Sequence, residues 1–337
     1  MACYQTSCAM AKKSGNHTKT GKAFEYACAN VLLHKYIQNN TVSLIESPQL
    51  KTARNSFNKL SEAEQIKYLQ GAEAAVRIID RLEPNLSSGN SLLSICLQTD
   101  DKGQKGDVRD VLCLRGTDWE IGFSCKHNHD AVKHSRLSKK IDFGKSWFNL
   151  PCSKSYFDAV NKIFIPLQKI KQERKDAVWA DVFQDIEEEC YVPVLNAFMQ
   201  ELKRLDNEYP GEIPKRLVKY LMGVNDFYKI IMNDKRQYTT IEAININGTL
   251  NKKYGKQKAL LDVPKIKLPS KFYEIGYQDN SKNKINVICD QGWNISMRIH
   301  NADSKIEPSL KFDVRLLAMP SSIITQMEPW TALEFEY

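Results

Sequence analysis

The chain has 337 residues, of which 42% are hydrophobic and 26% are charged. These values lie close to the average of globular proteins, which excludes a disordered chain, a collagen and a small disulfide-stapled protein. Lysine and arginine number 48 against 40 aspartates and glutamates, so the formal net charge is +8. Such a surplus suits a polyanionic partner, with ordinary solubility charge as the alternative.

The chain carries no sign of a membrane or secretory role. No stretch approaches the run of about 20 apolar residues that a spanning helix needs, and the N-terminus lacks the apolar core of a secretory signal. The nine cysteines are odd in number and form no C-x-x-C pair. This pattern favours reduced thiols over a disulfide framework, so we expect a cytoplasmic protein that does not contact a membrane.

Residue spacing predicts the elements in chain order. Apolar residues at helical spacing and a capping-box pair, Ser61 and Glu64, indicate two helices, and short apolar runs between turn residues indicate strands. The predicted elements are a helix over 19–37, a helix over 61–82, a strand over 92–97, a charged loop over 99–106, and a hairpin with strands over 110–116 and 119–126.

The period changes twice in the rest of the chain. From about 154 to 233 the apolar residues return to helical spacing, and after 236 short alternating segments are separated by polar breaks. We therefore expect an α/β protein with three segments. These are a mixed core over 1–150, a helical segment over 151–235 and a β-rich segment over 236–337.

The residues that carry chemistry lie between 106 and 140. Asp110 begins one strand of the predicted hairpin and Lys126 ends the other, so the two meet at one edge of a sheet. Mg²⁺ takes one or two carboxylates and fills its shell with water and substrate phosphate. Lysine is suited to orient a water there, because burial and a nearby metal lower its pKa. This pair therefore indicates a site for phosphodiester hydrolysis.

The same segment resembles the core of the PD-(D/E)xK nucleases, in which an Asp begins a strand and an acidic-x-Lys tripeptide ends the next. Asp110 matches the first position, and Ser124-Cys125-Lys126 matches the second with serine in place of the acid. Longer strings are similar to the HaeIII family of type II restriction endonucleases. They are GKAFEYACANVLL (21–33), SCKHNHDAVKHSRLS (124–138) and SMRIHNADSKIEPSLKFDVRLLAMP (296–320).

The resemblance implies a mixed central sheet flanked by helices and Mg²⁺-dependent cutting of double-stranded DNA within GGCC, with no small-molecule cofactor. In that scheme Asp110 binds Mg²⁺ and Lys126 orients the water that attacks phosphorus in line. The segment 151–235 is then a helical insertion that clamps the duplex, and 236–337 completes the core and recognises DNA. A palindromic site fits either a homodimer on DNA or a monomer that acts twice.

Serine at 124 means that another carboxylate must complete the site. Glu120 shares a face with Lys126, but six residues of strand separate the two by roughly 20 Å. Asp107 faces away in a regular strand and reaches the site only through a loop or bulge. We predict that Glu25 on the first helix binds the metal beside Asp110, with Asp107 as a second candidate and Glu73 as a weaker one.

Two groups of residues are predicted to contact DNA. The basic run at the end of the hairpin suits phosphates next to the cut; its members are Lys126, His127, Asn128, His129, Lys133, His134, Arg136 and Lys139. The late β-rich segment offers donors for guanine O6 and N7, although spacing does not separate base readers from phosphate contacts; the candidates are Arg298, His300, Asn301 and Lys311.

Other classes of function fit less well. A zinc site built on Cys125 and the nearby histidines lacks the usual ligand spacing, and Cys125 should face away from Lys126. Pro151-Cys152 is similar to the Pro-Cys of cytosine methyltransferases, but their glycine-rich cofactor loop is absent. A DNA-binding protein without catalysis has no use for Asp110 in a phosphate channel, where the acid repels DNA unless a metal intervenes. A nickase or repair nuclease shares the core motif and stays open.

Overall fold

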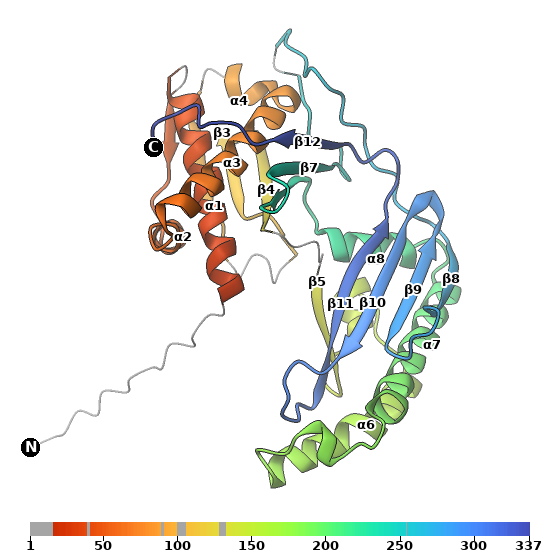
Figure 1. Ribbon diagram of the computed structural model, residues 1–337. Helices are drawn as coiled ribbons and strands as arrows, with labels where there is room; N and C mark the ends of the chain where they lie inside the picture. Colours follow the sequence, from red (N-terminus) through yellow and green to blue (C-terminus); the bar gives the residue numbers. More distant parts are fainter. Residues whose placement is uncertain (1–15, 39–40, 89–90, 100–105, 128–132, 254) are drawn as a thin grey trace, which may run out of the picture.

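The computed structural model describes residues 16–337 except 39–40, 89–90, 100–105, 128–132 and 254, and it describes only the backbone of 16–19, 133 and 134. Within these described residues, seven α-helices and twelve strands form two lobes (Figure 1). The helices are α1 (Asn16–Ile37), α2 (Pro48–Phe57), α3 (Glu62–Leu82), α4 (Pro84–Ser88), α6 (Lys154–Glu173), α7 (Val192–Glu208) and α8 (Ile213–Met222). Within this part of the chain, none of the helices has both the length and the apolar character that a membrane crossing requires.

The first lobe is built on a seven-stranded mixed sheet in the order β1-β2-β3-β4-β6-β7-β12. Its strands are β1 (Val42–Leu44), β2 (Leu93–Leu97), β3 (Val111–Arg115), β4 (Trp119–His127), β6 (Phe227–Asn233), β7 (Tyr238–Ile244) and β12 (Thr325–Pro329). β2, β3 and β4 form an antiparallel meander, and β6 lies parallel to β4. Helices α1, α2 and α3 share one apolar core with this sheet, which establishes a large mixed sheet flanked by helices.

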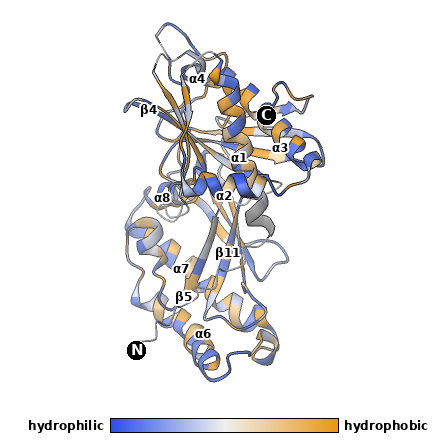
Figure 2. Cartoon of the chain, turned by 90° about the vertical axis from the view of Figure 1, so that its left-hand side faces the viewer, coloured by the Kyte–Doolittle hydropathy of each residue, from blue (hydrophilic) through white to orange (hydrophobic). Residues whose placement is uncertain are grey.

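The second lobe holds a five-stranded antiparallel sheet in the order β5-β11-β10-β9-β8. Its strands are β5 (Lys133–Ser138), β8 (Phe272–Tyr277), β9 (Lys284–Cys289), β10 (Asn294–His300) and β11 (Ser309–Ala318). Alternate residues such as Phe312, Val314 and Met297 are buried and share an apolar core with α6, α7 and α8. Along these helices and strands hydrophobic and hydrophilic residues alternate, as expected for elements with one buried face (Figure 2).

Most of the predicted elements are confirmed. The helix predicted over 19–37 is α1, and the helix over 61–82 is α3, whose N-terminus carries the predicted capping box between Ser61 and Glu64. The strand and the hairpin predicted between 92 and 126 are β2, β3 and β4. The charged loop lies mostly outside the described residues.

The prediction of continuous helix up to residue 233 is wrong. α8 ends at Met222 because Gly223 takes a positive φ of 90°, and the chain then enters β6. The sheets also cross the three predicted segments. β5 belongs to the five-stranded sheet, although it lies within 1–150. β6 and β7 join the seven-stranded sheet, and the C-terminal β12 is added at its edge beside β7. The roles assigned to the three segments stay predictions.

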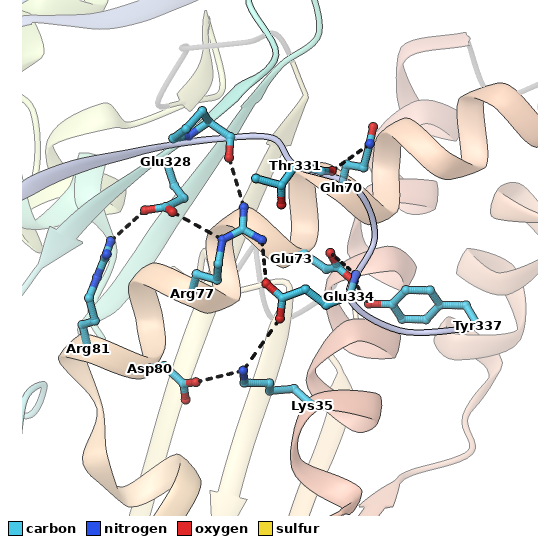
Figure 3. Close-up of polar contacts among 11 residues, drawn as sticks. Lys35, Gln70, Glu73, Arg77, Asp80, Arg81, Glu328, Thr331, Glu334 and Tyr337 are labelled. Carbon is cyan, nitrogen blue, oxygen red and sulfur yellow. Dashed lines mark hydrogen bonds and ion pairs between the residues drawn. The ribbon is translucent and has the colours of Figure 1, made fainter.

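The last residues of the chain lie across α3 and bind it through ion pairs and hydrogen bonds. Arg77 binds the carboxylates of Glu328 and Glu334, and Glu73 accepts hydrogen bonds from the Glu334 backbone and the Tyr337 hydroxyl (Figure 3). The Glu73 side chain is buried and is taken up by these contacts. Its prediction as a weaker metal ligand is therefore wrong.

Candidate active site

The ends of β3 and β4 meet as the hairpin predicts. Val111 pairs with Phe123, which places Asp110 beside Ser124. The ammonium Nζ of Lys126 lies 3.5 Å from Oδ2 of Asp110. The two side chains are 30% and 25% exposed, so a substrate phosphate can reach both.

The Asp110 carboxylate is held by backbone and side-chain donors. Its Oδ2 accepts a hydrogen bond of 2.7 Å from the backbone N–H of Cys125 and a longer one of 3.4 Å from the Ser124 hydroxyl. The backbone N–H of Asp110 donates to the Phe123 carbonyl at 2.7 Å. The acid therefore has a fixed position relative to Lys126, and Ser124 supports it from the place where an acid is expected.

Glu25 is brought to the same place by α1. Its side chain is buried, and Oε2 accepts a hydrogen bond of 3.0 Å from the Lys22 ammonium. Burial and the negative charge of Asp110 raise the pKa of Glu25 to about 7, against the opposing effects of Lys22 and Lys126. The negative charge of Asp110 thus acts on Glu25, and the repulsion between the two carboxylates is relieved by a bound cation.

The donors at this edge suit a hard divalent cation with few protein ligands. Asp110 and Glu25 supply carboxylate oxygens, and Mg²⁺ is satisfied with one or two of these. In the described part of the chain, no group of three or more His, Cys, Asp or Glu side chains is arranged to hold a metal. Asp110 and Glu25 are thus carboxylates of the kind that a hard divalent cation binds.

A zinc site is not supported by the position of Cys125. Its side chain is buried in the core shared with α1, on the opposite side of β4 from Lys126. A hydrogen bond with Cys28 and burial hold the pKa of the Cys125 thiol well above its usual range, which disfavours the thiolate that zinc requires. The side chains of His129 and His134 lie outside the described residues.

Asp107 lies in a different contact network. Its two oxygens accept hydrogen bonds of 2.8 Å each from the Arg109 guanidinium, and Oδ2 also accepts one from Gln98. Burial raises the pKa of Asp107, but these hydrogen bonds outweigh it and the pKa falls to about 2. The predicted loop does not turn this acid toward Asp110. The prediction of Asp107 as a catalytic and metal-binding residue is therefore not supported by its contacts.

Arg109 connects this network to the hairpin. Its guanidinium also binds Glu120 at 2.8 Å, so Glu120 is engaged away from Lys126, in agreement with its exclusion as a ligand. The aliphatic part of Arg109 crosses Gly122 so closely that a Cβ at residue 122 would lie 2.1 Å from Cδ of Arg109. Glycine at 122 is thus required by the arginine that precedes Asp110.

His127 lies at the end of β4 and is already engaged within the protein. Its Nε2 lies 2.6 Å from Oδ2 of Asp234, and its ring packs against Tyr68 at a centroid distance of 5.1 Å. These contacts fix the strand end that carries Lys126. A DNA contact by His127 stays a prediction.

Four of the residues predicted to bind DNA share one face of the five-stranded sheet. Pairing sets Arg136 opposite Lys311 and Lys311 opposite His300, and Arg298 lies two residues before His300 on the same strand. The opposite face packs on the helices, so these side chains lie on the outer face. We refer to Arg136, Lys284, Arg298, His300, Lys311 and Arg315 as the basic face.

The remaining residues that were predicted to contact DNA do not lie on this face or are not fully described. Asn128 and His129 lie outside the described residues, and Lys133 and His134 are described only as backbone of β5. Lys139 lies half-buried in the turn after β5. Asn301 is used inside the protein, because its amide accepts from the Tyr191 hydroxyl and donates to the Asp303 carbonyl.

Comparison with known proteins shows which family the chain belongs to. Residues 21–320 match the model of the HaeIII restriction endonuclease family. The chain belongs to that family. It is 41% identical over 324 residues, which is 95% of this chain and 99% of the relative, to "Type II restriction enzyme HaeIII" of Haemophilus aegyptius. No solved structure matches the chain. As a member of the HaeIII restriction endonuclease family the protein is a site-specific deoxyribonuclease that binds DNA.

Family membership also removes the methyltransferase alternative, and the structure agrees. Cys152 is buried, its sulfur accepts a hydrogen bond from the Gly144 N–H, and burial raises the pKa of its thiol. A buried thiol of high pKa is a poor nucleophile.

Two features near these surfaces are missing from the sequence interpretation. Lys229 and Glu242 form a buried ion pair of 3.1 Å that, with Ser124 and Lys126, lines a cavity of about 40 Å³. The sequence pattern predicts helix for the residues of β6, so it does not place Lys229 beside Ser124 and Lys126. Asp313 lies among the cations of the basic face, and its signal was the alternation of Lys311, Asp313 and Arg315 along one strand.

Proposed function

We propose that this restriction endonuclease cuts double-stranded DNA within GGCC by Mg²⁺-dependent hydrolysis at a PD-(D/E)xK site. The contact of 3.5 Å between Lys126 and Asp110, at the joined ends of two antiparallel strands, carries the proposal. The GGCC specificity rests on membership of the HaeIII family, and the fold assignment is supported by the meander β2-β3-β4 with β6 parallel to β4.

We assign the cation to Asp110 and Glu25. When bound, Mg²⁺ supplies Lewis-acid stabilisation of the charge that develops on the scissile phosphate. The carboxylate of Asp110 is already oriented by the Cys125 N–H, so the site needs little rearrangement to bind. Glu25 is drawn into its charged form, since a cation offsets the burial and the repulsion from Asp110 that raise its pKa.

Lys126 contacts the attacking water and the scissile phosphate in this proposal. Its ammonium is a compact donor that orients the attacking water and neutralises charge on a phosphate oxygen. Asp110 keeps this ammonium at the strand end, and the Ser124 hydroxyl supports Asp110. The predicted contacts that follow Lys126 bind the backbone of the duplex beside the cut, and the basic face contacts the same duplex.

We further propose that two copies act on one palindromic site, one for each strand. Sedimentation of the protein with a short GGCC duplex should then give two chains per duplex. One chain per duplex throughout the titration would indicate a monomer that acts twice.

Cutting of plasmid DNA by wild type, Asp110→Ala and Lys126→Ala tests the proposal. Wild type should give discrete fragments that end within GGCC in Mg²⁺. Both variants should bind a GGCC duplex in Ca²⁺ without cutting in Mg²⁺. Equal cutting by all three proteins would place the active site elsewhere. Binding of GGCC by all three without any cutting would make the protein a DNA-binding protein without catalysis.

A further inference from the structure

Asp313 contacts Arg298, His300 and Lys311 at the centre of the basic face. Its Oδ2 lies 2.8 Å from the Arg298 guanidinium and 3.0 Å from Nε2 of His300, and its Oδ1 lies 3.7 Å from Nζ of Lys311. The three partners come from two neighbouring strands, β10 and β11. The register sets Arg298 directly opposite Asp313 and His300 opposite Lys311.

This cluster lies at the surface, where ion pairs hold it together. The Asp313 side chain is 17% exposed, whereas that of Arg298 is 46% exposed, so the carboxylate forms the floor and the guanidinium stands above it. A carboxylate beneath several cations fixes where their donors point, and a fixed donor loses less conformational entropy on binding than a free one. The two cations Arg298 and Lys311 on one acid still leave a surplus of positive charge, which attracts DNA.

The chemistry of the cluster matches a G·C base pair. In the major groove Arg or Lys donates to O6 and N7 of guanine, and an Asp or Glu carboxylate accepts from N4 of cytosine. The cluster offers both kinds of group side by side on one face of the sheet. Resting on the proposed function, we infer that Asp313 with Arg298 and Lys311 reads a G·C pair of the recognition site, and that Asp313 is a specificity-determining residue.

The position of the cluster relative to the proposed active site agrees with this role. In β5 the backbone of residue 134 pairs with Asp313, and residue 134 follows Lys126 by eight positions. Eight residues of extended chain span at most about 28 Å. Four base pairs rise by roughly 14 Å, so a base of the site lies within reach while the cut is made inside that site.

Replacement of Asp313 separates base reading from backbone binding. Wild type and Asp313→Asn are titrated in Ca²⁺ with a GGCC duplex, with four duplexes that each carry one A·T pair in place of a G·C pair, and with an unrelated duplex. Asp313→Asn should lower the preference for GGCC over at least one substituted duplex by tenfold or more. Its affinity for the unrelated duplex should stay the same or rise, because a negative charge is removed.

Arg298→Ala is the second variant, since 46% of the Arg298 side chain is exposed. It should lose preference at the same base pair as Asp313→Asn. Lys284→Ala is the matched control, because Lys284 lies opposite Arg298 on the same face but on β9; it should weaken binding to all duplexes alike.

The two proposals fail in different ways. If wild type does not prefer GGCC, the proposed function and the inference both fall. If wild type prefers GGCC and both variants keep its preference, or lose affinity for every duplex equally, the cluster contacts backbone only and the inference alone is overturned.

Discussion

Glu25 shows what the position of a single residue adds to a motif. The chain has serine where PD-(D/E)xK nucleases carry an acid, and α1 supplies a buried carboxylate, Glu25, whose pKa is raised by burial and by the charge of Asp110. The motif predicted Asp110 and Lys126, and helical spacing predicted α1. The choice between Glu25, Asp107 and Glu73 needed the structure, because it depends on where Arg109 and the C-terminal residues lie.

Glu25→Gln tests this replacement of the missing acid. The variant should still bind a GGCC duplex, but its cutting rate in Mg²⁺ should fall about 100-fold or more. The loss of a metal ligand removes several kcal/mol of the stabilisation of charge in the transition state. Glu62→Gln, at the exposed start of α3, is the matched control and should cut at the wild-type rate. Single-turnover cleavage of a labelled duplex measures all rates.

A second substitution distinguishes a ligand from a merely structural glutamate. Ser124→Asp places a carboxylate beside Asp110, where the Ser124 hydroxyl now lies 3.4 Å from Oδ2. Added to Glu25→Gln, it should recover at least tenfold of the lost rate. Full activity of Glu25→Gln alone, or a double variant no faster than Glu25→Gln, would exclude Glu25 as the substitute acid.

Glu83 predicts a pH dependence of stability that is separate from the active site. Burial raises its pKa to about 7, although hydrogen bonds from the Tyr228 hydroxyl and the Asn251 N–H oppose the rise. Because the folded pKa exceeds the unfolded value of 4.5, the folded state holds the proton more tightly. Its stabilising effect is complete below about pH 4.5 and is lost as the pH rises through 7.

The measurement compares wild type with Glu83→Gln, which keeps an oxygen for both donors and carries no charge. From pH 5 to pH 8 the free energy of unfolding of wild type should fall by about 2 kcal/mol more than that of the variant, as followed by denaturant titration. Parallel pH profiles for the two proteins would show that Glu83 ionises at its ordinary pKa.

At the scale of elements, the β3–β4 hairpin is held in shape by the contact of Arg109 with Gly122. The guanidinium is fixed at both ends by Asp107 and Glu120, so its aliphatic part cannot withdraw without breaking an ion pair. Arg109 directly precedes Asp110. The network that includes Asp107 therefore positions the strand end that carries the proposed metal ligand.

Gly122→Ala should displace Arg109 and disturb Asp110. We expect a loss of about 1–3 kcal/mol in the free energy of unfolding, the usual range for overpacking, together with slower cutting in Mg²⁺. Gly21→Ala is the matched glycine control, because an added Cβ there meets no atom within 4 Å and alanine favours the helix. Thermal and denaturant unfolding give the comparison; equal stability of Gly122→Ala and wild type would contradict the account.

The elements with clear periodicity were predictable and the others were not. The capping box predicted the start of α3, and alternation predicted β9 and β11. β6 was taken for helix because its residues are buried on both faces, which leaves an apolar run without alternation. β5 has only one large apolar residue, Leu137, so its pattern carries little signal.

At the scale of the whole molecule, both sheets are assembled from distant parts of the chain. β6 inserts between β4 and β7, and β5 crosses from the first lobe to pair with β11 (Figure 1). Local patterns do not report such pairings, because strand partners far apart in sequence are chosen by the packing of the whole core. The short stretch between β4 and β5 thereby joins the proposed active site to the basic face.

The most direct test of the account is a crystal structure of the protein with a GGCC duplex and Ca²⁺, which binds such sites without supporting the cut. We predict a cation about 2.3–2.6 Å from carboxylate oxygens of both Asp110 and Glu25, with an oxygen of the scissile phosphate as a further ligand and Nζ of Lys126 beside it. A cation held without Asp110, or a scissile phosphate far from Lys126, would contradict the proposed active site.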